Sequence, residues 1–248
     1  MNAHPLSARR ALASALLALA PLGALAATTL YDPALGSLPL AQGWQPLVPL
    51  IGAAASQSVG GGVYALDTTG AGVSIWGNSR ISPLALDTQA GFDLSFSLQL
   101  LSETHSSPNR AGYTLVMVGA QARQALELEF WAGNIWAQKY DAGQPDRFVH
   151  DIDAPFDTTA ALTPYTLAVR QQQFTLSAGG MALLSGALRD YTLGGLPYTT
   201  PNFLFLGDSS SRGNSISRLG VVSLSPVPEP AAGWLMALGL AGLALRRR

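Results

Sequence analysis

Apolar and polar residues alternate with a period of two through most of this chain. The clearest run places Phe92, Leu94, Phe96, Leu98 and Leu100 between polar side chains. Because successive side chains of a β-strand point to opposite faces, this run predicts a strand with one buried face. Similar runs, separated by segments rich in turn residues, cover residues 113–118, 126–130, 165–169, 174–176, 181–184, 202–206 and 219–224. Many short strands with turn signals between them are typical of an all-β sandwich.

The part of the chain between residues 27 and 227 is long enough for one domain with its own core. Its first stretch, residues 28–62, is less regular and predicts an edge strand with a loose loop. Nine Lys and Arg residues stand against 14 Asp and Glu residues, a formal charge of −5. That balance argues against a nucleic-acid partner, which needs a basic face. The chain has no cysteine, which excludes disulfides, thiol catalysis and cysteine metal sites.

The first 26 residues have the organisation of a secretory signal peptide. Arg9 and Arg10 precede an apolar stretch that ends in Ala24-Leu25-Ala26, a small-x-small pattern. A basic start, a short apolar region and that pattern predict cleavage between Ala26 and Ala27.

The last residues of the chain combine three features in a fixed order. Val227 is followed by Pro228-Glu229-Pro230, and the two prolines predict an extended, exposed backbone. The apolar run 231–245 then predicts one short membrane helix. Three arginines end the chain and are expected on the cytoplasmic side, which leaves the Pro-Glu-Pro outside. They are Arg246, Arg247 and Arg248.

This order of motif, helix and arginine cluster resembles the PEP-CTERM sorting signal of Gram-negative bacteria. The resemblance covers residues 227–248. It implies an exported protein that is held at the inner membrane, cut near Pro-Glu-Pro by an exosortase, and delivered to the cell surface or extracellular matrix. Because such proteins are associated with exopolysaccharide and biofilm matrix, a polysaccharide is the expected partner. An ordinary single-span tail anchor is the alternative, and it needs no Pro-Glu-Pro.

From residue 92 onward the strand rhythm resembles concanavalin A-like, or laminin G-like, jelly-roll domains. The segments that carry this resemblance are 92–96, 126–131, 165–169 and the turn at 206–211. The resemblance implies a jelly-roll β-sandwich and says little about activity. The predicted organisation is therefore a signal peptide (1–26), a β-sandwich (27–225) and a sorting signal (226–248).

One hairpin is the candidate binding site. Gly133-Asn134 predicts a two-residue turn between strands 126–132 and 135–140, which would pair Trp131 with Trp136. The strand face that carries both rings would also carry carboxylates and an amide, a combination that suits contact with sugars. Structural packing of the rings, with a loop covering them, is the alternative. The residues of this predicted glycan face are Trp131, Trp136, Tyr140, Glu127, Glu129 and Gln138.

The two glutamates also suggest a hydrolase. The run Glu127 to Ala132 resembles the carboxylate strand of retaining sandwich glucanases. That pattern needs a central aspartate and a further glutamate, whereas the run here stops after two carboxylates. Adjacent outward positions on one strand lie about 7 Å apart, beyond the spacing of about 5–5.5 Å in retaining enzymes. That spacing falls within the range of inverting pairs, but nothing else in the sequence supports such an assignment, and we predict no catalytic residues.

No cofactor is predicted, although calcium is an alternative, because oxygen-rich loops can bind it. Solvated acidic loops are the simpler interpretation, and no loop matches an EF-hand. His105 and His150 are expected at the surface, without a catalytic motif around them. The acidic residues considered for calcium are Asp141, Asp146, Asp151, Asp153, Asp157 and Asp208.

Three function classes follow from the sequence. They are a structural or adhesive envelope protein, a glycan-binding module and a glycoside hydrolase, in that order.

Overall fold

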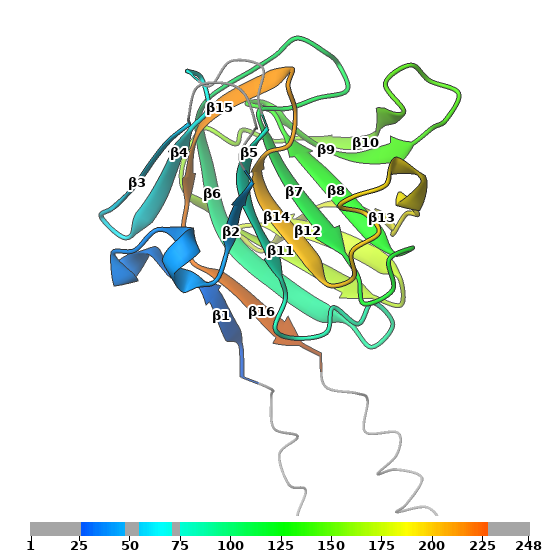
Figure 1. The fold of residues 1–248 in the computed structure, drawn as a ribbon, viewed down its shortest axis with the longest axis horizontal. Helices are drawn as coiled ribbons and strands as arrows, with labels where there is room; N and C mark the ends of the chain where they lie inside the picture. Colours follow the sequence, from blue (N-terminus) through cyan, green and yellow to red (C-terminus); the bar gives the residue numbers. More distant parts are fainter. Residues whose placement is uncertain (1–25, 48–54, 71–74, 228–248) are drawn as a thin grey trace, which may run out of the picture.

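The computed structural model describes residues 26–47, 55–70 and 75–227, which form two antiparallel β-sheets stacked face to face (Figure 1). The predicted all-β sandwich is thus confirmed. Most of the predicted signal peptide (residues 1–25), the Pro228-Glu229-Pro230 motif, the apolar run 231–245 and the terminal arginines lie outside the described residues. Within the described ranges, no helical segment is long and apolar enough to cross a membrane.

The larger sheet has nine strands, in the order β13-β12-β11-β6-β15-β4-β3, while β16 pairs with both β6 and β1. Its strands are β1 (Thr28–Tyr31), β3 (Ser56–Gly60), β4 (Val63–Asp67), β6 (Phe92–His105), β11 (Thr163–Arg170), β12 (Gln173–Ala178), β13 (Met181–Ala187), β15 (Gly213–Leu219) and β16 (Val222–Pro226).

The smaller sheet has seven strands, in the order β10-β9-β8-β7-β14-β5-β2. They are β2 (Gln45–Leu47), β5 (Trp76–Ile81), β7 (Tyr113–Val118), β8 (Ala125–Phe130), β9 (Asn134–Tyr140), β10 (Phe148–Pro155) and β14 (Phe203–Asp208). Three short 3-10 helices lie in the connections, η1 (Pro33–Leu35), η2 (Pro39–Gln42) and η3 (Thr192–Gly194).

The core lies between the sheets and follows the alternation of the sequence. On β6, the apolar side chains of residues 92–100 are buried while the polar ones between them are half-buried. Phe96 stacks on Tyr165 of β11, with ring centroids 5.3 Å apart, and meets the edge of Phe130 from β8. These contacts join the two sheets and position the hairpin of β8 and β9.

Two sequence expectations need correction. The run 219–224, predicted as one strand, is split at Gly220, whose N–H donates to the carbonyl of Ser97 at 2.8 Å. As a result β15 and β16 pair one after the other along the long strand β6. The irregular first stretch, residues 28–62, contains three short strands and two 3-10 helices within its described part, more than one edge strand.

Candidate functional site

The predicted hairpin of β8 and β9 is present, but its predicted register is wrong by two residues. Phe130 pairs with Ile135 and Glu129 with Trp136, and the N–H of Trp131 donates to the carbonyl of Asn134 at 2.8 Å. The connection is therefore longer than the predicted two-residue turn. A shift of two residues leaves every side chain on its predicted face, because the strand period is two.

The outer face of the seven-stranded sheet carries a layer of buried polar side chains, here called the acidic layer: Thr114, Glu127, Glu129 and Gln138. The half-buried Ser209 follows β14 at the edge of this layer. Glu127 is 2% exposed and Glu129 is 0% exposed. The prediction placed this face in solvent, whereas the structure covers it. The alternative of structural packing under a loop therefore describes these side chains.

Each carboxyl group of the acidic layer has several hydrogen-bond partners. The hydroxyl of Tyr198 donates to Glu127 Oε2 at 2.5 Å, and Ser209 donates to Glu127 Oε1 at 3.3 Å. Thr114 donates to Glu129 Oε2 at 2.8 Å, and the amide of Gln138 donates to Glu129 Oε1. Such a network satisfies buried polar atoms that would otherwise be costly to bury.

Burial raises the pKa of both glutamates, and the neighbouring charge of Glu127 raises that of Glu129 further, well above its ordinary value. The hydrogen bonds from Tyr198, Ser209 and Thr114 act in the opposite direction. The balance leaves the pKa of each glutamate above its ordinary value, so burial favours the protonated form of both carboxyl groups.

Two further charged groups bear on this pair. The guanidinium of Arg110 lowers the pKa of both glutamates electrostatically. Asp208 is the last residue of β14 and is 0% exposed. Burial raises the pKa of its carboxyl group to about 8. The N–H of Ser210 donates to Asp208 Oδ1 at 2.9 Å, which lowers this pKa in part. The charge of Asp208 raises the pKa of Glu129 in turn.

The acidic layer is covered by residues 188–202, here called the cover segment. Its first part pairs with β8, because Arg189 and Ala125 exchange backbone hydrogen bonds at 2.8 Å. The hydroxyl of Tyr191 donates to the carbonyl of Gln138 at 2.5 Å, and Tyr198 holds Glu127. Tyr191 and Tyr198 also pack against Phe148 of β10. Two exposed leucines, Leu193 and Leu196, lie in the cover segment.

Four rings form a second feature beside the acidic layer, here called the ring cluster: His105, Trp131, Trp136 and His150. His105 stacks on Trp131 and His150 stacks on Trp136, each pair with centroids 4.3 Å apart. The two indoles meet edge to face at 5.5 Å. Trp136 is fully buried, while Trp131 is half-buried. The histidines, expected merely as surface residues, are thus parts of this cluster.

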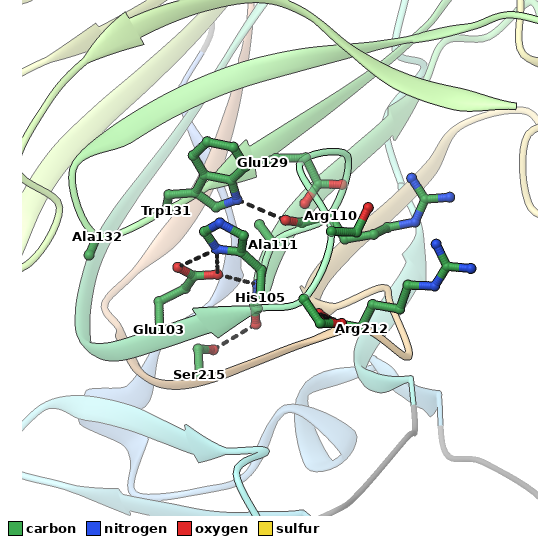
Figure 2. Close-up of polar contacts among 12 residues, drawn as sticks. Glu103, His105, Arg110, Ala111, Glu129, Trp131, Ala132, Arg212 and Ser215 are labelled. Atoms are coloured by element: carbon green, nitrogen blue, oxygen red, sulfur yellow. Dashed lines mark hydrogen bonds and ion pairs between the residues drawn. The ribbon is translucent and has the colours of Figure 1, made fainter. Parts of the chain in front are cut away.

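The loop around Arg110 connects the ring cluster to the acidic layer (Figure 2). The indole N–H of Trp131 donates to the carbonyl of Arg110 at 2.8 Å. His105 Nδ1 lies 3.1 Å from Glu103, whose Oε1 also accepts from the N–H of Gly112 at 3.1 Å. Figure 2 shows the guanidinium groups of Arg110 and Arg212 on the side of the loop away from Trp131.

The structure brings together all six residues of the predicted glycan face, but only two keep contact with solvent. Trp131 and Tyr140 are half-buried, and the other four are buried. Sequence reasoning missed Thr114, Ser209, Tyr198 and Arg110. No sequence signal connects them to the hairpin, because each comes from a different part of the chain and reaches it only through the fold.

The acidic residues considered for calcium are spread over several separate contacts. Asp146 pairs with Arg212 at 2.8 Å, and Asp151 pairs with Arg189 at 2.6 Å. Asp157 accepts from the N–H and hydroxyl of Thr159, and Asp208 is buried in the sheet. Over residues 26–47, 55–70 and 75–227, no group of three or more His, Asp or Glu side chains is arranged to hold a metal.

Comparison with known families confirms the predicted PEP-CTERM sorting motif. Residues 226–248 match the family described as the PEP-CTERM protein-sorting motif. No curated protein matches the chain. The motif implies export and sorting through a membrane-anchored precursor that an exosortase processes.

Comparison with solved structures supports the sandwich. The chain is similar to a carbohydrate esterase from the Shiga toxin-encoding bacteriophage phi24B, with 14% identity over 82% of this chain and 100% of that one, and a TM-score of 0.56. It also matches alginate lyase A1-II′, with 13% identity, 74% and 94% coverage and a TM-score of 0.46. A third match is the carbohydrate binding module CBM66 from Bacillus subtilis, with 10% identity, 74% and 95% coverage and a TM-score of 0.42. At such identity the likeness concerns the fold alone.

Proposed function

We propose that this chain is an exported envelope or extracellular-matrix protein of a Gram-negative bacterium, with a structural or adhesive role among exopolysaccharides. The PEP-CTERM match supports the export and the sorting. The observation that supports a structural role is the closure of the acidic layer. Its carboxyl groups are bound to Tyr198 of the cover segment and to Thr114 and Gln138 of the sheet, instead of facing an open cleft.

The proposed route of the protein follows from the two ends of the chain. The signal peptide starts export, and the terminal arginines stop translocation, because positive charge is retained on the cytoplasmic side. The apolar run 231–245 then anchors the precursor in the inner membrane until an exosortase cuts near Pro-Glu-Pro. The sandwich is released or transferred to the cell surface or matrix.

The test of this proposal is the mass and location of the protein in its native cell. We expect a mature chain that begins near Ala27, ends near the Pro-Glu-Pro and fractionates with the cell surface or matrix. A protein that keeps its signal sequence and its arginine terminus and remains in the cytosol would contradict the proposal. Comparison with a strain that lacks the exosortase shows whether the C-terminal cut depends on that enzyme.

Glycan contact at the ring cluster is a second candidate function. It is supported by the half-buried indole of Trp131, which is oriented by its hydrogen bond to Arg110 and stacked on His105. An aromatic ring at such a position can stack on the apolar face of a sugar. Trp131→Ala should lose glycan binding, while Trp131→Phe should keep part of it. A glycan array of the wild-type protein, followed by titration of both variants, measures this; equal binding by Trp131→Ala would contradict it.

A further inference from the structure

The strand that leads into the sorting motif is held on both of its edges. On one edge of β16, Ser223 pairs with Ser95 of β6; on the other, it pairs with Thr29 of β1. The side chains of Val222 and Leu224 are fully buried in the core. The match to the sorting motif begins at residue 226, the last residue of β16. The motif therefore starts inside the sheet, not on a free linker.

The anchoring continues one residue past β16. The N–H of Val227 donates to the carbonyl of Gly91 at 3.0 Å. Gly91 has a φ of +105°, and a Cβ there would lie 2.6 Å from the carbonyl of Val169, so only glycine fits this position without strain. The N–H of Gly91 donates in turn to Asp87. Residues 87–91 thus form a fixed support under the first residue of the tail.

The distance between this support and the membrane is short. Three residues, Pro228, Glu229 and Pro230, separate Val227 from Ala231, where the apolar run begins. Even fully extended, the four residue steps from Val227 to Ala231 span only about 14 Å. In the precursor the end of the sandwich must therefore lie at the membrane surface. β1 begins at this same end, beside the last residues of β16 (Figure 1).

A protease that needs a longer extended segment would have to pull β16 out of the sheet. That would break its pairing with β6 and with β1 at once and expose Val222 and Leu224 to water. Apolar burial and ladder hydrogen bonds both oppose such a step. Fraying of a free edge strand would be easier, but β16 has a neighbour on each side.

We propose that the exosortase processes the folded precursor with β16 still paired, and that it docks against the end of the sandwich formed by residues 87–91, the start of β1 and the end of β16. This inference rests on the proposed function, because it concerns the partner that removes the sorting tail. The occupant of this surface is thus the exosortase, which meets the sandwich at the bilayer to which the tail is tied.

Disulfides can lock β16 in place, and the absence of cysteine in the natural chain makes each introduced pair unambiguous. Ser95 and Ser223 are Cα partners, and both are half-buried on the outer face. Antiparallel partners lie about 4.5–5.5 Å apart, within the reach of a disulfide. The full-length double variant Ser95→Cys/Ser223→Cys therefore ties β16 to β6. The double variant Thr29→Cys/Ser223→Cys applies the same lock from β1.

The matched control is Ser95→Cys/Thr166→Cys. These residues are also Cα partners on the outer face, but their disulfide ties β6 to β11 and leaves β16 free. Each chain is expressed in the native, exporting host, and mass spectrometry reports both the loss of two hydrogens and the C-terminal cut. We expect the locked chains and the control to be processed to the same extent as the wild type, within about twofold.

Accumulation of precursor in both locked variants, with normal processing of the control and recovery after reduction, would overturn the inference. It would show that β16 must leave the sheet before cleavage. Failure of the wild-type chain to be cut in a host with an active exosortase would overturn the proposed function instead. The two failures are therefore distinguishable in one experiment.

Discussion

The outer faces of the two sheets differ in their surroundings although their sequences follow the same rule. On β6, the outward residues Ser95 and Ser97 are half-buried and lie between apolar neighbours. On β8, the outward residues Glu127 and Glu129 also lie between apolar neighbours, yet they are almost fully buried. Alternation identifies the face that points to the core. It does not determine whether water or another part of the chain meets the opposite face.

The cover segment accounts for the difference. It lies over the seven-stranded sheet, where Tyr191 and Tyr198 supply hydroxyl groups to polar partners below them. On the nine-stranded sheet, small hydroxyl side chains occupy the outer face instead. One cross-strand row of such residues consists of Ser223, Ser95, Thr166 and Ser177, which are successive partners on neighbouring strands. The outer face of the seven-stranded sheet is therefore a polar core, while that of the nine-stranded sheet is a surface.

The largest expected effect tests whether the outer face of the seven-stranded sheet is a core. Trp136 is fully buried between Trp131 and His150. Trp136→Ala should lower the free energy of unfolding by about 3–5 kcal/mol, as for other buried aromatic residues. Trp131→Ala, on the same hairpin but half-buried, should cost clearly less. Urea unfolding measures both, and equal losses would contradict the difference in burial.

A smaller loss should follow when the cover segment is detached from the acidic layer at one point. Tyr198→Phe removes the donor to Glu127 and leaves that buried carboxyl group with one partner fewer. We expect a loss of about 1–3 kcal/mol in the free energy of unfolding. Tyr140→Phe, on the same face but half-buried, is the control and should change little. A neutral Tyr198→Phe would show that the hydrogen bond does not hold the cover segment.

The fold was predictable from the sequence because alternation and turn residues are local signals. The strands around Phe96, Leu128 and Tyr165 lie where the alternation predicts them. The hairpin register was not predictable, since Gly133-Asn134 favours a two-residue turn that the wider connection replaces. The burial of Glu127 was not predictable either, because its partner Tyr198 lies 71 positions away along the chain. The local sequence pattern determines which face of a strand points to the core. Segments distant in the sequence determine whether the opposite face is buried or exposed to water.

The buried carboxyl groups of the seven-stranded sheet should make the stability of the protein depend on pH. The pKa of Asp208 is raised to about 8, and those of Glu127 and Glu129 are also raised. Asp208 therefore keeps its proton in the folded protein between about pH 4 and pH 8, where the unfolded chain has released it, and the two glutamates keep theirs above the pH at which free glutamates titrate. The stabilising contribution of these protons is complete below about pH 4 and is lost as the pH rises through the pKa values of the folded protein.

Each such group contributes a slope of up to about 1.4 kcal/mol per pH unit. Asp208→Asn resembles the protonated form, so it should reduce this slope while leaving stability near pH 4 almost unchanged. Urea titrations at a series of pH values provide the measurement. A stability that rises between pH 5 and pH 8 in the wild-type protein would show that the buried carboxyl groups are ionised in the folded state.

The smallest effect is expected on the outer face of the nine-stranded sheet, where substitution tests whether this face is only a surface. Thr166 and Ser177 are cross-strand partners, and both are half-buried. Thr166→Ala and Ser177→Ala should each change the free energy of unfolding by less than about 0.5 kcal/mol, as is usual at surface positions. A loss as large as that of Tyr198→Phe would mean that these hydroxyl groups also belong to a buried network. The contrast between the two faces would then depend on side-chain size and not on the cover segment.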